Sequence, residues 1–189
     1  SILDDILANE ENLLEGETQL TLHLPESGEE KNGDEVFKSS SERGTRIHYD
    51  ISSIIDSGFN NSDLCSKKEM LWIVDKLSGF LDNYIFISEK QIKFPIFNMM
   101  MNGIPDLILK PRSVDSDYQI WDYKTGVMDK EKLVLYWFQL YCYAYASFLN
   151  EELLFGKKIK LVICCIDEEK LLEKEVSKED VDNFCLLYT

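Results

Sequence analysis

The chain has 189 residues, enough for one domain with a substantial core, and 44% of them are apolar, as in soluble globular proteins. The formal net charge of −15 argues against a domain that captures polyanions by long-range attraction. Five cysteines, an odd number, argue against a disulfide framework and favour reduced thiols in a cytoplasmic protein. The first residue is Ser and no signal peptide is evident, so we expect a piece of a longer polypeptide.

The first 42 residues differ from the rest in composition. Residues 1–24 hold an acidic, helix-like opening, and the alternation at 19–24 is compatible with a short strand. Residues 25–42 are polar, with Ser-Gly and Asn-Gly pairs and a serine run, which predicts a flexible loop. We therefore expect one globular domain over residues 43–189, preceded by an acidic segment and this loop.

Two helices are predicted next, over residues 45–57 and 67–81. Thr45 is a plausible N-cap of the first helix. His48 lies on the flank of its apolar stripe, where a histidine is more often a satisfied buried or boundary residue than a metal ligand. The stripe consists of Ile47, Ile51, Ile54 and Ile55.

Four strands follow, over residues 84–87, 91–101, 104–110 and 118–124. Asn102-Gly103 is a strong hairpin signal, which would place Asp106 near the start of the returning strand. Pro105 suits a strand start, an edge or a bulge. Because Asp106 is the single charge in an apolar run, we expect a metal ion or another cation beside it.

The strand at 118–124 carries a second carboxylate and a lysine. Side chains alternate along a strand, so Asp122 and Lys124 share one face and Tyr123 points to the other. An Asp-x-Lys pair alone is usually a solvated strand end. The second aspartate, in an otherwise apolar strand, is what favours a functional site.

A long helix is predicted over residues 129–149, followed by a strand at 158–166 and a closing helix at 178–187. Gln139 and Tyr143 share a face of the long helix, and Gln139 is the only amide in its apolar stretch. This apolar stretch is too short and too polar to span a membrane. The element order predicts an α/β fold, a central mixed sheet flanked by helices.

Pro105-Asp106 together with Asp122-Tyr123-Lys124 resembles the PD-(D/E)XK nuclease superfamily, which implies a restriction-endonuclease-like core. Three further segments resemble its RecB-type branch, in the same order along the chain. They are Gly44-Thr45-Arg46-Ile47-His48, Gly103-Ile104-Pro105-Asp106 and Gln139-Leu140-Tyr141-Cys142-Tyr143. The chain is most similar to the C-terminal nuclease domain of the AddA and RecB helicase–nuclease subunits.

The resemblance implies a metal-dependent DNA exonuclease acting in recombinational double-strand-break repair. It implies one or two Mg²⁺ or Mn²⁺ ions held by His48, Asp106, Asp122 and the backbone carbonyl of Tyr123. An imidazole ligand favours manganese. Lys124 would orient or help to deprotonate the attacking water. Gln139 and Tyr143 would line the site near the DNA strand.

Some relatives carry an iron–sulfur cluster on grouped cysteines, but the cysteines here lack that grouping, so none is expected. The acidic charge fits least well with DNA binding. We therefore expect DNA to be delivered by a helicase in the same polypeptide or in a partner subunit, with no membrane involved. Local cations would guide the strand: Lys90, Lys93, Lys110, Arg112 and Lys124.

Two alternatives remain. The first is a catalytically silent nuclease fold that tracks DNA or assembles subunits, which would suit an acidic surface. The second is a metal-dependent phosphatase, which would need further ligands or a nucleophile that the sequence does not offer.

Overall fold

The computed structural model describes residues 40–96, 99–150, 154 and 157–186, and the strand expected at 19–24 lies outside them. Its centre is a five-stranded sheet in the order β1-β4-β5-β6-β7. β5 and β6 are parallel, and the other neighbours are antiparallel. The strands are β1 (Tyr84–Ser88), β4 (Leu107–Pro111), β5 (Tyr118–Lys124), β6 (Lys158–Cys165) and β7 (Lys170–Ser177).

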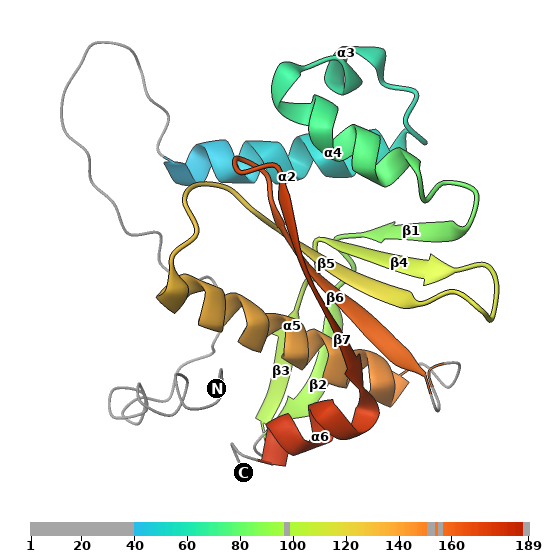
Figure 1. The fold of residues 1–189 in the computed structure, drawn as a ribbon, viewed down its shortest axis with the longest axis vertical. Coiled ribbons are helices and arrows are strands. Elements are labelled where there is room, and N and C mark those ends of the chain that lie inside the picture. The colour runs from blue at the N-terminus through green and yellow to red at the C-terminus, as the bar shows by residue number, and fades with distance from the viewer. Residues whose placement is uncertain (1–39, 97–98, 151–153, 155–156, 187–189) are drawn as a thin grey trace.

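Helices cover both faces of this sheet (Figure 1). On one face lie α2 (Ser40–Asp56), α3 (Ser62–Cys65) and α4 (Lys68–Ser78). On the other lie α5 (Lys130–Asn150), which connects the parallel strands β5 and β6, and α6 (Lys178–Leu186). Parallel strands need such a crossover. The predicted α/β fold with a mixed sheet and flanking helices is therefore confirmed.

Two apolar cores fill the space between the layers. The isoleucine stripe of α2 packs against one face of the sheet, and Leu140 and Ala144 of α5 pack against the other. β5 and β6 lie at the centre and are almost entirely buried. Alternation sends Cys164 of β6 into the first core and Cys165 into the second. The end of β5 is thus fixed from both sides.

The region before β4 differs from the sequence prediction. The single strand expected at 91–101 is two strands, β2 (Ile92–Ile96) and β3 (Met99–Gly103), which pair as a hairpin apart from the main sheet. Asn102 and Gly103 are not its turn, because they end β3 opposite Lys93 and Ile92. Asp106 precedes β4 instead of lying within it.

Two other predictions need correction. Thr45 is not an N-cap, since α2 begins at Ser40 and therefore also includes the last residues of the expected loop. β7 was missed, because half of its eight residues are charged and only Val176 is buried. Such a sequence suits an edge strand, where charged side chains discourage pairing with other chains.

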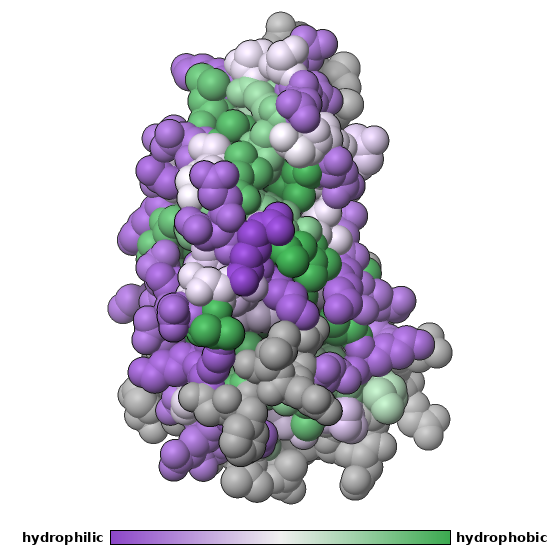
Figure 2. Space-filling model, turned by 90° about the vertical axis from the view of Figure 1, so that its right-hand side faces the viewer, coloured by the Kyte–Doolittle hydropathy of each residue, from purple (hydrophilic) through white to green (hydrophobic). Residues whose placement is uncertain are grey.

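Hydrophilic and apolar residues are interspersed on the face that contains the outer end of β1 (Figure 2). Two of the exposed apolar side chains are Leu71 on α4 and Ile85 on β1. Within the described residues, no helix is both long and apolar enough to cross a membrane.

Candidate active site

Asp106 lies between β3 and β4, and both of its carboxylate oxygens have partners. Oδ1 is 3.0 Å from His48 Nδ1, and Oδ2 accepts a 2.6 Å hydrogen bond from the backbone N–H of Tyr123. Its own carbonyl accepts from the N–H of Glu89, just after β1. The carboxylate is therefore fixed between helix α2 and strand β5, and the metal ion or cation expected beside it stays a prediction.

His48 reaches Asp106 from the middle of α2. Its ring also meets the ring of Tyr123 edge-on, with centroids 5.7 Å apart. Burial opposes a charge on the imidazole, but the Asp106 carboxylate outweighs it, and the pKa of His48 is raised. The structure thus brings His48 into the site, even though its position on the helix alone would suit a core residue.

Asp122 and Lys124 lie side by side at the end of β5, as alternation predicted. Lys124 Nζ is 2.7 Å from Asp122 Oδ2. Oδ2 is buried, and Lys124 is its one polar partner among the described residues. Burial, together with the charge of Asp106, raises the pKa of Asp122 to about 6, while Lys124 acts to lower it. Asp122 is thus a desolvated carboxylate that a cation would stabilise.

Lys124 remains charged. Burial acts against its ammonium, but the carboxylates of Asp122 and Asp106 outweigh this, and the pKa of Lys124 is raised. Nζ also lies 4.3 Å from the ring centroid of Tyr136. A cation over an aromatic face is attracted to it. Tyr136 was not singled out in the sequence, although its position three residues before Gln139 puts both on one side of α5.

Gln139 and Tyr143 are joined on α5, and Tyr143 connects the helix to the segment before Asp106. Gln139 Nε2 donates to Tyr143 Oη at 2.8 Å, and that hydroxyl donates to the carbonyl of Ile104 at 3.4 Å. The ring of Tyr143 lies against Gly103, where an added Cβ would come within 2.4 Å of Cε1. Tyr143 is only 3% exposed. Its position therefore suits holding the Gly103–Asp106 segment, while the predicted contact with a DNA strand stays a prediction.

These residues fit a divalent metal ion by their chemistry but are not arranged as a finished metal centre. The set offers an imidazole and two carboxylates, and the buried Oδ2 of Asp122 has Lys124 as its one polar partner among the described residues. Among the residues that the structure describes, however, no three His, Cys, Asp or Glu side chains are grouped as metal ligands. His48 Nδ1 lies 3.0 Å from Asp106 Oδ1, so the imidazole would hold an ion through Nε2 or after giving up this contact.

Apart from Lys124, the proposed guiding cations divide into two groups. Lys90 follows β1 close to Asp106, and Lys93 lies on the hairpin strand beside Asn102; both are exposed. Lys110 and Arg112 lie at the far end of β4, because each strand residue adds about 3.3 Å. Lys110 and Arg112 are therefore poorly placed to guide a strand into this site.

The sequence matches a known protein family. Residues 83–185, more than half of the chain, match the model of the PD-(D/E)XK nuclease superfamily. The chain belongs to this superfamily. The matched region of this PD-(D/E)XK chain contains Asp106, Asp122, Lys124, Gln139 and Tyr143, and it begins after His48.

A solved structure titled "Crystal structure of SSO0001" aligns with 78% of this PD-(D/E)XK chain and 71% of its own, with 16% sequence identity and a TM-score of 0.32. No curated protein matches the chain in sequence.

Proposed function

We propose that this chain is a divalent-metal-dependent deoxyribonuclease domain that hydrolyses phosphodiester bonds, as the exonuclease of a helicase–nuclease in recombinational double-strand-break repair. The observation that carries the proposal is that α2, the segment just before β4 and the end of β5 bring His48, Asp106, Asp122 and Lys124 together. Membership of the nuclease superfamily supports the same reaction class.

In this proposal, His48, Asp106, Asp122 and the carbonyl of Tyr123 hold one or two Mg²⁺ or Mn²⁺ ions. A bound ion would polarise the scissile phosphate and lower the pKa of a bound water. The imidazole makes manganese the better-suited ion. The burial of Asp122, at 2% exposure, is the feature that a cation would offset most.

Lys124 acts in this proposal through its charge. Because its pKa is raised, its ammonium stays protonated at neutral pH and is a donor, not a base. Nζ contacts both the carboxylate of Asp122 and the ring of Tyr136. Lys124 therefore orients the attacking water and offsets negative charge at the phosphate as the phosphodiester bond breaks.

The helicase partner is proposed on the basis of charge. At −15, the chain repels DNA at long range, and of the four guiding cations outside the site, Lys90 and Lys93 lie nearer to it than Lys110 and Arg112. A motor in the same polypeptide or in a partner subunit would deliver the strand. The similarity of the Gly-Thr-x-x-His and Gln-x-x-x-Tyr segments to AddA and RecB supports this assignment.

A cleavage assay on end-labelled linear DNA and on circular DNA tests the proposal, with Mn²⁺, Mg²⁺ or EDTA. The expected result is metal-dependent cutting of linear DNA that Asp122→Asn abolishes. Asp117→Asn is a matched control, because Asp117 is an exposed aspartate just before the other end of β5. If DNA is still cut in EDTA and by the Asp122→Asn variant, the assignment of the active site is wrong.

The silent alternative has one observation in its favour, the lack of a finished three-ligand metal group among the described residues. It predicts no Mn²⁺ binding and no cutting, even with a helicase partner present. The nuclease proposal predicts that Mn²⁺ binds and that Asp122→Asn weakens this binding.

A further inference from the structure

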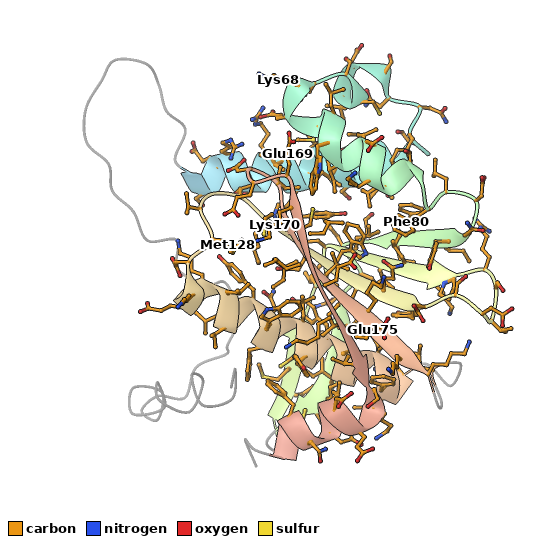
Figure 3. All side chains as sticks on the ribbon, viewed as in Figure 1. Lys68, Phe80, Met128, Glu169, Lys170 and Glu175 are labelled. Carbon is orange, nitrogen blue, oxygen red and sulfur yellow. The ribbon has the colours of Figure 1, made fainter. Side chains whose placement is uncertain are left out.

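The turn between β6 and β7, residues 166–169, lies against the segment that follows Lys124. The N–H of Ile166 donates to the carbonyl of Lys124 at 2.9 Å, and Glu168 Oε1 accepts from the N–H of Met128 at 3.0 Å. Glu169 in this turn and Met128 in the facing segment are both labelled in Figure 3. Acidic residues of this turn therefore accept hydrogen bonds from the backbone that follows the candidate site.

Asp167 makes the shortest contacts of this turn. Oδ2 accepts from the backbone N–H of Gly126 at 2.6 Å. The same carboxylate accepts hydrogen bonds from the two terminal guanidinium nitrogens of Arg43, from Nη1 at 2.9 Å on Oδ2 and from Nη2 at 2.6 Å on Oδ1. A two-point contact between arginine and a carboxylate fixes orientation as well as distance. We call Arg43, Asp167 and Gly126 together the Asp167 bridge.

The Asp167 bridge joins the two elements that carry the reactive groups. Arg43 lies five residues before His48 on α2, about 7.5 Å along the helix axis. Gly126 follows Lys124 by two residues and has φ +83°, a left-handed backbone that favours glycine. One carboxylate thus fixes the start of the His48 helix and the turn that ends the Asp122–Lys124 strand.

Stability alone is a weak explanation for this bridge. The side chains of Arg43 and Asp167 are 38% and 30% exposed, and exposed ion pairs contribute only about 0–1 kcal/mol. Position is a stronger explanation, because small displacements of reactive groups reduce rates steeply. The guanidinium of Arg43 also lowers the pKa of Asp167, so the bridge stays charged at neutral pH.

We infer that Asp167 is a positioning residue, which sets His48 of α2 relative to Asp122 and Lys124 of β5 through Arg43 and Gly126. This inference rests on the proposed nuclease activity. It adds a residue that acts on the site through its contacts with Arg43 and Gly126.

A second ion pair on the same helix supplies a matched control. Arg46 of α2 contacts Glu69 of α4 at 2.9 Å, with exposures of 42% and 30%, close to those of the Arg43–Asp167 pair. This pair also anchors α2 but does not reach β5. Glu69→Gln therefore removes an ion pair of α2 and leaves the Asp167 bridge between α2 and the end of β5 in place.

The test compares Asp167→Asn and Arg43→Gln with Glu69→Gln, after thermal melts show that all three are folded. The first readout is the ring NMR signal of His48 at fixed pH. The chain has two histidines, so His23→Gln assigns it. Asp167→Asn and Arg43→Gln should shift or broaden this signal, and Glu69→Gln should leave it unchanged. The same unchanged signal in all three variants would overturn the inference.

The second readout is Mn²⁺-supported cleavage. Asp167→Asn should lower kcat about tenfold with little change in KM for DNA, and Glu69→Gln should change neither. Equal losses in both variants would reduce Asp167 to an ordinary surface ion pair and overturn the inference. The histidine signal needs no activity, so a wild-type protein that fails to cut would contradict the proposed function separately.

Discussion

Gly103→Ala should destabilise the protein through a single contact with Tyr143. An alanine Cβ at this position would lie 2.4 Å from Cε1 and 3.2 Å from Cδ1 of the ring, and Cβ atoms almost never approach closer than 3.0 Å. The ring cannot easily yield, because Tyr143 is 3% exposed and its hydroxyl is bonded to Gln139 and Ile104.

The size of the effect follows from overpacking, which costs about 1–3 kcal/mol in a buried position. For a domain of this length, that corresponds to a fall in Tm of roughly 2–12 °C. Gly103 has no left-handed backbone, so φ strain does not contribute. The loss should therefore come from the clash with Tyr143.

A double-mutant cycle in urea isolates this clash. Tyr143→Ala alone should cost about 3–5 kcal/mol. Because alanine at 143 removes the obstacle, the double variant should be more stable than the sum of the single variants by about 1–3 kcal/mol. Gly79→Ala is the control, since its Cβ would meet only a carbonyl at 3.7 Å. Additive losses at 103 and 143 would refute the reasoning.

Three other outcomes are expected. Tyr136→Leu should slow cleavage by roughly 2- to 30-fold through loss of the ring beneath Lys124, whereas Tyr136→Phe should not; equal rates would contradict this. Because the pKa of Asp167 is lowered in the folded protein, its carboxylate stabilises the fold at pH values above the unfolded pKa near 3.8, and this contribution is lost as the pH falls through the folded pKa. In Asp167→Asn, the free energy of unfolding should lack this pH-dependent contribution, which is less than about 1 kcal/mol because the carboxylate is partly exposed. Gln119→Leu should cost about 2–5 kcal/mol in urea unfolding, because it leaves a buried indole N–H and a phenol without partners; a neutral result would show that they find others.

Local patterns in the sequence predicted much of the fold. β5 has the predicted bounds, and α5 is displaced by one residue at each end, because aromatic and β-branched runs favour strands and long apolar periodicity favours helices. Alternation along β5 also correctly placed Asp122 beside Lys124. These features depend on residues that are close together in sequence, so the amino-acid sequence alone is enough to predict them.

The errors involve contacts between distant residues. Asn102-Gly103 has the composition of a hairpin turn, yet Gly103 is required by the Tyr143 ring packed against it. The same holds for Asp167, whose partners are 124 and 41 residues away in sequence. No periodicity or turn rule reports such a bridge, which depends on how the β6–β7 turn meets α2.

The most direct test of the central claim is Mn²⁺-dependent cleavage of labelled linear DNA under single-turnover conditions. Wild-type protein and Asp117→Asn should cut at the same rate, and Asp122→Asn should be slower by about a hundredfold or more. Cutting by Asp122→Asn at the wild-type rate would contradict the assignment of the site at the end of β5.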